Sequence, residues 1–471
     1  MPLIKLNKYI IITLILLATI LSLGAWSITD YYVGSNIPVV GARNTGMGFT
    51  GVYDNFSPMS ISLNPANLLL MNEYYGITIG GMFTRNEDNR SIPLYNSFDA
   101  YIDDATINSN INIFDNYGFS QYGRLNSDNI KAGIGLHYLP VVSFKGKYYE
   151  EVRNNRGSDN DLYPEIIAFN QIDNKGALNA LGVTLGGGYK IKDDSSIQIG
   201  LTINNINGTS ESNKSIKWSG KAMELLISSP SYSSLNRNVF PDSVFIHKSE
   251  MSGIQLKLGS AFQVNNRLGI GLAYSMKSKF DRDTDIKSIY GPDTLAIATS
   301  VANLPTVVTY NSIDDTYVLP SRMRIGFNYQ PRNIMRTYFN AEIENTAWKD
   351  VNKLFENSWD IYVGVEHSVT NRIPLRLGFQ SATEWQVNPD YINLTSDGLP
   401  MLEVTKIITP SITAGSSVNL RKNVTLDIGL SFSWREYQAL DMFRDGYYND
   451  KVYTGLVDYV LWPRPYIYPK D

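Results

Sequence analysis

Hydrophobic and polar residues alternate with period two along much of the chain. Within residues 254–264, Ile254, Leu256 and Leu258 alternate with Gln255 and Lys257, and residues 268–276 and 424–435 repeat this pattern. Because successive side chains of a β-strand point to opposite faces, each run has one apolar and one polar face. The pattern therefore predicts an all-β protein built from long antiparallel strands.

The length of these runs and the breaks between them predict a transmembrane barrel. The runs reach about eleven residues, and a tilted transmembrane strand needs about 9–11, whereas ordinary strands most often have about 5–6. Short polar turns alternate with long polar stretches, as expected of periplasmic turns and external loops. The turns lie at 126–129, 192–195, 265–267, 330–333, 370–372 and 421–423, and the long stretches near 85–106, 146–175, 208–250, 281–316, 348–357, 386–400 and 438–450.

This alternation assigns residues 73–471 to a barrel of about fourteen strands, an even number as in single-chain bacterial barrels. The polar faces carry many glycines and charged residues, among them Lys257, Arg324 and Arg376, which is typical of a wet lumen. The expected strands are 73–84, 107–124, 130–143, 176–190, 196–207, 251–264, 267–279, 317–329, 335–347, 358–368, 374–385, 404–419, 423–437 and 451–462.

Residues 1–27 have the pattern of a cleavable signal peptide. Lys5 and Lys8 precede an almost wholly apolar stretch at 9–23, and Ala25 and Ser27 place small residues before a cut after Ser27. The apolar stretch is shorter than the roughly 20 residues that span a bilayer, which disfavours a permanent anchor. The chain is therefore expected to be exported to the outer membrane of a Gram-negative-type bacterium.

Residues 28–72 are rich in glycine and proline and do not have a strand pattern. Side chains alone cannot fill the interior of a barrel of about fourteen strands. We therefore expect this segment to be a plug, or hatch, inside the lumen; a disordered periplasmic tail is the alternative. Gly46, Gly48 and Gly51 also match G-x-G-x-x-G, but no strand–helix–strand unit surrounds them, so no cofactor is predicted.

The glycine-rich stretch at 41–48 and the triplet Asn64-Pro65-Ala66 that follows it resemble the plug of the FadL/TodX family of outer-membrane transporters. The plug motif comprises Gly41, Gly46, Gly48, Asn64, Pro65 and Ala66. Parts of the last third of the chain also resemble the later strands of that family, at 319–326, 348–350, 359–366 and 373–379. The loops between 85 and 250 show no such likeness.

The resemblance implies a fourteen-strand barrel with an N-terminal hatch. It also implies passive transport of a hydrophobic small molecule, either a long-chain fatty acid or an aromatic hydrocarbon. The ligand would be caught among external loops, held in an internal apolar pocket and released sideways through a gap in the wall. Membrane lipids and the outer-membrane assembly machinery are the other expected partners. The C-terminal residues, Tyr468-Pro469-Lys470-Asp471, depart from the aromatic end that this machinery usually reads.

Two other functions remain open at this point. PorV-like barrels share the glycine and Asn-Pro-Ala features and serve protein secretion or partner binding, whereas a general porin would have an open aqueous channel. Two runs in the long loops, 221–227 and 295–302, are apolar enough either to capture an oily ligand or to pack on the barrel rim. Conductance would separate an open channel from a plugged barrel.

Composition excludes several other classes of protein. The net charge is −4, with no long basic run, so nucleic-acid binding has no electrostatic support. The chain has no cysteine and only three histidines, of which His137 and His367 fall in expected strands and His247 in an expected loop. None of them has the spacing of a metal site or a hydrolase motif. We therefore predict neither a catalytic site nor a metal site.

Overall fold

A computed structural model describes residues 33–435 except 96–99, 154–165, 220–241, 291–306, 333–335, 371–372, 395–399 and 422. Four predictions lie outside these residues: the signal peptide (1–27), the apolar loop runs at 221–227 and 295–302, the long stretch at 438–450, and the last expected strand (451–462). No helix in the described part is both long and apolar enough to cross a membrane.

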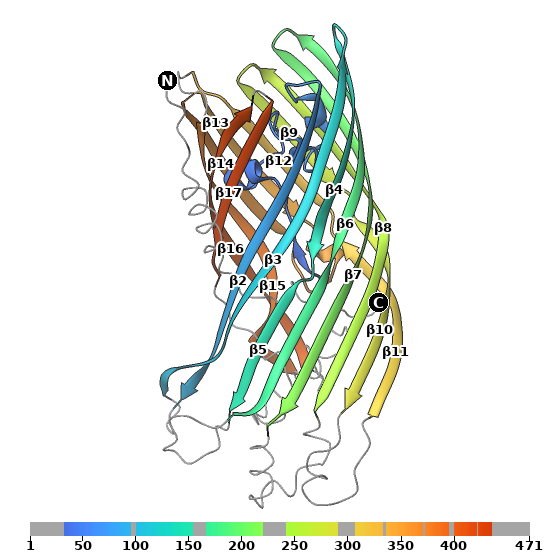
Figure 1. Ribbon diagram of the computed structural model, residues 1–471, viewed down its shortest axis with the longest axis vertical. Helices are drawn as coiled ribbons and strands as arrows, with labels where there is room; N and C mark the ends of the chain where they lie inside the picture. The colour runs from blue at the N-terminus through green and yellow to red at the C-terminus, as the bar shows by residue number, and fades with distance from the viewer. Residues whose placement is uncertain are drawn as a thin grey trace, which may run out of the picture.

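The chain forms one large antiparallel sheet that curves around the N-terminal residues (Figure 1). A two-residue strand, β1 (Ser35–Asn36), belongs to the enclosed segment. The wall consists of β2 (Tyr75–Tyr95), β3 (Tyr101–Asn126), β4 (Ile130–Ser143), β5 (Gly146–Arg153), β6 (Ile166–Lys192), β7 (Ser195–Trp218), β8 (Ser243–Asn265), β9 (Leu268–Ser275), β10 (Ser278–Tyr290), β11 (Val307–Leu319), β12 (Arg322–Tyr329), β13 (Thr337–Thr346), β14 (Ser358–Thr370), β15 (Ile373–Leu394), β16 (Pro400–Arg421) and β17 (Val424–Ser433).

Three of the wall strands are interrupted. β4 and β5 both pair with β6, β9 and β10 both pair with β8, and β11 continues into β12 after a break at Pro320 and Ser321. Counted as continuous, the described part contains thirteen wall strands. The barrel fold is confirmed, and the fourteenth strand stays a prediction because residues 451–462 are outside the described part.

The period-two alternation gives the wall an apolar outer face and a more polar inner face, as predicted. In β8 the side chains of Ile254 and Leu258 are 65% and 47% exposed, whereas the intervening Gln255 is 7% exposed. Large apolar side chains are exposed on strands all along the sheet. Such a belt is what a transmembrane barrel presents to lipid.

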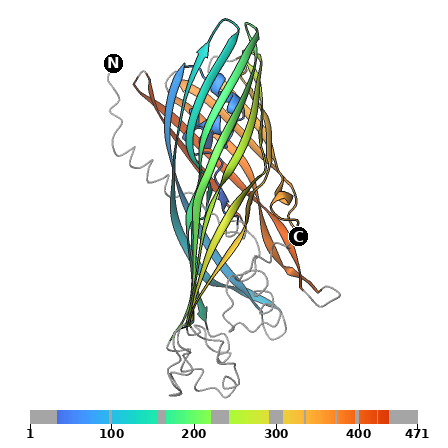
Figure 2. The same cartoon turned by 90° about the vertical axis from the view of Figure 1, so that its right-hand side faces the viewer.

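Five of the stretches that we expected to be loops contain strand extensions. The expectation was wrong for much of 85–106, 146–175, 208–250, 281–316 and 386–400, and His247 lies in β8 rather than in a loop. The outward apolar belt of β7 ends at Ile203, and beyond it Asn205, Asn207 and Thr209 are exposed. Once the outer face meets water, the alternation of apolar and polar residues disappears while the backbone ladder continues. Figure 2 shows extensions at 208–250 and 281–316 in green to yellow, reaching far past the enclosed segment.

The short turns that lie wholly within the described residues were predicted correctly. β4 spans the expected 130–143, and tight connections join β6 to β7 and β8 to β9 at 192–195 and 265–268. Asn265 shows why such a connection is short: its side-chain oxygen accepts hydrogen bonds from the backbone N–H groups of Arg267 and Leu268 at 2.8 and 3.0 Å. Asparagine favours turns because its side chain bonds in this way to nearby backbone.

Candidate functional site in the barrel lumen

Residues 33–72, called here the N-terminal segment, fold inside the wall as short helical turns joined by irregular backbone. These elements are α3 (Ala42–Gly46), η1 (Pro58–Ser62) and η2 (Pro65–Leu69), seen in blue in Figure 1. Proline occupies the first position of both η1 and η2, where its missing N–H and fixed φ suit a helical start. The segment contacts strands on every side, from β2 through β8 to β17.

Asn64, Pro65 and Ala66, singled out in the sequence, lie against β7 and β8. Asn64 is fully buried, and its side chain accepts a hydrogen bond from Ala66 N at 3.1 Å, which caps η2. The amide of Asn64 donates to Val52 O within the segment at 2.6 Å and to Ser260 O in the wall at 3.0 Å. One buried side chain therefore organises the segment and also attaches it to the barrel.

Glycines of the wall make room for this triplet. Gly200 of β7 and Gly259 of β8 are direct cross-strand partners. A Cβ on Gly259 would lie 2.0 Å from Asn64 Oδ1, and a Cβ on Gly200 would lie 2.5 Å from the carbonyl carbon of Pro65. No side chain fits at either position without displacing the segment.

Gly46 and Gly48 lie against the opposite wall, on a second set of cross-strand glycine pairs. Gly364 pairs with Gly378, and Gly415 pairs with Gly429. A Cβ on Gly378 would lie 2.1 Å from Gly48 N, and one on Gly46 would lie 2.9 Å from the Cα of Gly415. Gly48 also has φ of +65°, a conformation that side chains rarely adopt.

The remaining motif glycine, Gly41, is the N-cap residue of α3. A Cβ there would lie 2.7 Å from the side-chain oxygen of Asn44 and 3.1 Å from Cβ of Met59. The structure thus places the six motif residues along one segment, but against two opposite walls of the barrel. The lumen-facing glycines of the wall, which we attributed to a wet interior, instead contact the segment backbone directly.

Buried charges attach the segment to β12–β17. Arg43 of α3 forms an ion pair with Glu366 of β14, and Arg376 of β15 donates from Nε to the same carboxylate at 2.6 Å. Arg376 also bonds to Asp427 of β17 at 2.8 Å, so the cluster joins three wall strands to the segment. The guanidinium of Arg43 lies over the ring of Phe56, 4.2 Å from its centroid.

A second buried pair lies deeper in the same wall. Arg324 Nε donates to Glu342 Oε2 at 2.7 Å, and both residues are 4% exposed. The other oxygen of Glu342 accepts from the backbone N–H groups of Gly51 and Val52 at 2.7 and 2.9 Å. Arg324 in turn donates to Phe49 O at 2.7 Å. This pair therefore binds the segment through its backbone and needs no particular side chain there.

The wall is incomplete where the segment first meets it. The β3–β4 backbone ladder stops at Phe119 and Tyr138. Beyond that point β4 pairs with β1 of the segment, through Ser35 with Ser143, and Ile37 N donates to Val141 O at 2.9 Å. Residues 35–37 thus pair with a stretch of β4 that has lost its β3 partner.

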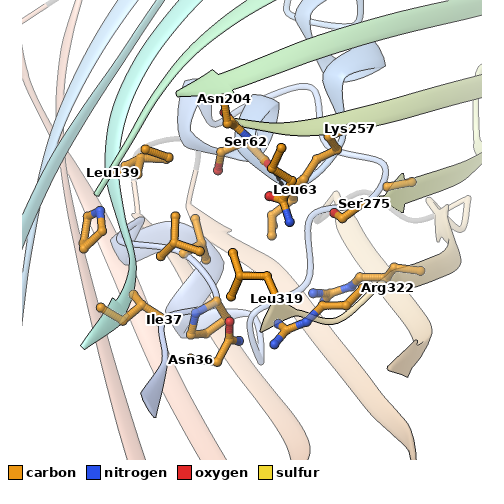
Figure 3. A pocket seen from close by; sticks show the side chains of 18 of the residues that line it. Asn36, Ile37, Ser62, Leu63, Leu139, Asn204, Lys257, Ser275, Leu319 and Arg322 are labelled. Carbon is orange, nitrogen blue, oxygen red and sulfur yellow. Dashed lines mark hydrogen bonds between the residues drawn. The ribbon is translucent and has the colours of Figure 1, made fainter. Parts of the chain in front are cut away.

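A cavity of about 110 Å³ lies between the segment and the wall next to this place. Figure 3 shows Lys257, Ser275 and Arg322 along one side and the apolar Ile37 and Leu139 on the other. The cavity is also lined by the apolar Val39, Val141, Leu319 and Pro320 and by the polar His137, Asn204, Gln255, Arg324 and Glu344. The site therefore suits a small ligand with both an apolar body and a polar group.

Few of these cavity residues could have been identified from sequence alone. Lys257 and Arg324 were predicted to face the lumen, but nothing in their spacing indicated a shared cavity. His137 is 2% exposed, and its Nε2 lies 3.0 Å from Asn204 Oδ1, a contact between strands that only the register reveals. Within the described residues, no group of His, Asp and Glu side chains is arranged to hold a metal ion.

Comparisons with known proteins give a fold but no close relative. Neither a protein-family model nor a curated protein sequence matches the chain. Among solved structures, the CymD monoaromatic hydrocarbon channel is 14% identical, with alignment covering 84% of this chain and 93% of CymD, and the TM-score is 0.50. The chain has the CymD fold.

Two further structures are similar at lower scores. A FadL homologue from Pseudomonas aeruginosa is 14% identical over 88% of this chain and 94% of its own, with a TM-score of 0.49. The Pseudomonas putida toluene transporter TodX is 14% identical over 84% and 98%, with a TM-score of 0.48. The predicted resemblance to FadL/TodX-type barrels is thus confirmed for the fold, through CymD.

Proposed function

We propose that the protein is an outer-membrane passive transporter for hydrophobic small molecules, in which residues 28–72 form the plug. The observation that supports this most directly is the cavity of about 110 Å³ between the N-terminal segment and the wall. It lies within a barrel whose outer face carries an apolar belt, so a ligand held there is shielded from water on the way through the membrane.

The position of the cavity indicates a route out of the barrel. Leu139 and Val141 line the cavity just past the end of the β3–β4 ladder, and Ile37 covers them from the lumen side. When residues 35–37 leave β4, a ligand in the cavity can pass between β3 and β4 towards the lipid. No energy source is required, since the ligand moves down its concentration gradient into an apolar phase.

A disulfide lock tests this route. The chain has no cysteine, so a designed pair is unambiguous. Ser35 and Ser143 are cross-strand partners, and such partners have Cα atoms about 4.5–5.5 Å apart, within the range that a disulfide bridges. We expect oxidised S35C/S143C cells to lose uptake of radiolabelled toluene and oleate, and a reductant to restore it. Whole cells are needed, because phospholipid vesicles are themselves permeable to apolar compounds.

The matched control is a second pair of serines inside the wall. Ser411 and Ser433 are also cross-strand partners, and neither belongs to the segment. S411C/S433C should therefore form its disulfide without changing uptake. Equal uptake by the oxidised and reduced forms of S35C/S143C would show that residues 35–37 do not block the exit.

The arrangement of the segment favours this function over a general porin. The segment contacts both walls of the barrel and is held there by buried charges and close backbone packing. A porin needs an open aqueous channel at that depth. A secretion accessory of the PorV type would instead depend on an external surface, and much of the external loop sequence is outside the described residues.

A further inference from the structure

The polar side of the cavity is a row of hydrogen-bond donors on three neighbouring strands. Ser275 of β9 pairs in register with Lys257 of β8 on one side and with Arg322 of β12 on the other. Side chains of directly opposed residues stand about 4.5–5.5 Å apart at Cβ and share a face. An ammonium, a hydroxyl and a guanidinium therefore lie next to one another along this edge of the cavity, as Figure 3 shows.

The charges around the cavity do not balance. Its charged lining consists of Lys257, Arg322, Arg324 and a single carboxylate, Glu344. Arg324 is already paired with Glu342 at 2.7 Å and lies 3.8 Å from Glu344. Among the described residues, Lys257 and Arg322 form no ion pair, and the ammonium of Lys257 donates only to the backbone carbonyl of Ser62, at 2.5 Å. Two cations thus face the cavity without a carboxylate within ion-pair distance.

The size of the cavity and its apolar side limit which ligands could bring a carboxylate to these two cations. An apolar cavity of about 150 Å³ is known to hold one benzene ring. The volume here is about 110 Å³, which matches a ligand body of one ring or a short alkyl chain. Ile37 and Leu139 would contact that body opposite the donor row, and Leu319 would contact it beside Arg322.

We propose that the ligand of this cavity is a small carboxylate with an apolar body, of the benzoate type, bound through Lys257, Ser275 and Arg322. This rests on the proposed function for the route, but it names a ligand that is neither a neutral hydrocarbon nor a long acyl chain. A carboxylate accepts several hydrogen bonds at once, and bonds between charged partners are about twice as strong as neutral ones.

Calorimetric titration of the purified full-length protein in detergent tests the proposal with four probes: benzoate, benzyl alcohol, toluene and palmitate. We expect benzoate to bind at least about tenfold more tightly than benzyl alcohol, because the alcohol has the same ring but no charge. Tighter binding of palmitate or toluene than of benzoate would overturn the proposal, as would equal binding of benzoate and benzyl alcohol.

Variants test whether the donor row of Lys257, Ser275 and Arg322 causes the preference for benzoate. Lys257→Gln and Arg322→Gln should each lower benzoate affinity about tenfold or more while leaving benzyl alcohol affinity unchanged. Lys279→Gln is the matched control, because it removes the same charge from an exposed position on the outer face of β10. Unchanged benzoate affinity in either cavity variant would refute the proposed contacts.

The two proposals fail in different ways. If cells expressing the protein take up toluene and oleate but benzoate shows no preference in the titration, this inference falls and the transport proposal stands. If benzoate binds as expected but the disulfide lock leaves uptake unchanged, the ligand assignment stands and the exit route falls.

Discussion

Two walls of the same barrel hold the same N-terminal segment by different means. The β12–β17 wall has paired glycines of its own and adds buried charges, with Glu366 bound to Arg43 and Glu342 bound to the backbone N–H groups of residues 51 and 52. The β7–β8 wall uses space: paired glycines, Gly200 and Gly259, let the backbone of the Asn-Pro-Ala triplet come within contact distance. Charges resist displacement strongly but tolerate sequence changes in the segment, whereas the glycine surface allows no added atom.

The largest loss of stability should follow from removing Arg324, one of the buried charges of the β12–β17 wall. Arg324→Met leaves the carboxylate of Glu342 buried without its cation, which costs about 3–5 kcal/mol. Denaturant unfolding of the reconstituted barrel measures the loss. Ion conductance in planar bilayers should rise, because the segment loses the hydrogen bond from Arg324 to Phe49 O, and Glu342, which accepts from Gly51 and Val52, loses its cation.

The double variant Arg324→Met/Glu342→Gln sharpens this test. It removes both charges, but the glutamine oxygen can still accept from the N–H groups of Gly51 and Val52. We therefore expect the double variant to be more stable than Arg324→Met alone. A double variant that is no more stable would show that the lost stability comes from packing around Arg324 rather than from the stranded carboxylate.

A side chain added at the paired glycines of the β7–β8 wall should cause an intermediate loss of stability. Gly259→Ala places a Cβ 2.0 Å from Asn64 Oδ1, so the triplet must shift, at a cost of about 1–3 kcal/mol. Gly187→Ala in β6 is the matched control, because no atom lies within 4 Å of its Cβ. That change should be neutral or slightly stabilising, since alanine restricts the unfolded chain. Equal effects of the two substitutions on unfolding would show that the close approach at Gly259 is unimportant.

How far the sequence could predict this molecule depends on how local each signal is. The apolar belt and the tight turns were predictable, because the alternation around Ile254 and the turn residues around Asn265 act over a few neighbours. The strand extensions were missed where both faces meet water, as at Asn205 and Asn207, since the alternation is then lost. The plug motif itself was recognisable within residues 41–66.

The partners of the motif were not predictable. Arg43 and Glu366 are 323 residues apart in sequence, and their ion pair depends on the register of several strands. The same holds for Gly200 with Gly259 and for the row of Lys257, Ser275 and Arg322. Each of these wall residues has an ordinary local setting, and its role arises only when neighbouring strands bring the members together.

Removing an ion pair outside the lumen should cause the smallest loss of stability, because water screens that pair. Asp350 of η3 (Trp348–Asp350) accepts from Lys277 Nζ at 3.0 Å and from Ser321 Oγ at 2.9 Å, and these two residues lie at the interruptions of neighbouring wall strands. Partial burial favours a raised pKa for Asp350, but the hydrogen bonds from Lys277 and Ser321 outweigh it and lower the pKa overall. Asp350→Asn should therefore cost at most about 1 kcal/mol at neutral pH.

The pH dependence of the stability difference between the parent protein and Asp350→Asn provides the control for this prediction. A carboxyl group whose pKa is lowered by folding adds stability above its unfolded pKa of about 3.9, and this is lost as the pH falls through the lower folded value. Unfolding of the parent and of Asp350→Asn should therefore differ at pH 7 and converge at strongly acidic pH. A cost at neutral pH as large as that of Arg324→Met would mean that water does not screen this pair, and the contrast between buried and exposed charges in this barrel would fail.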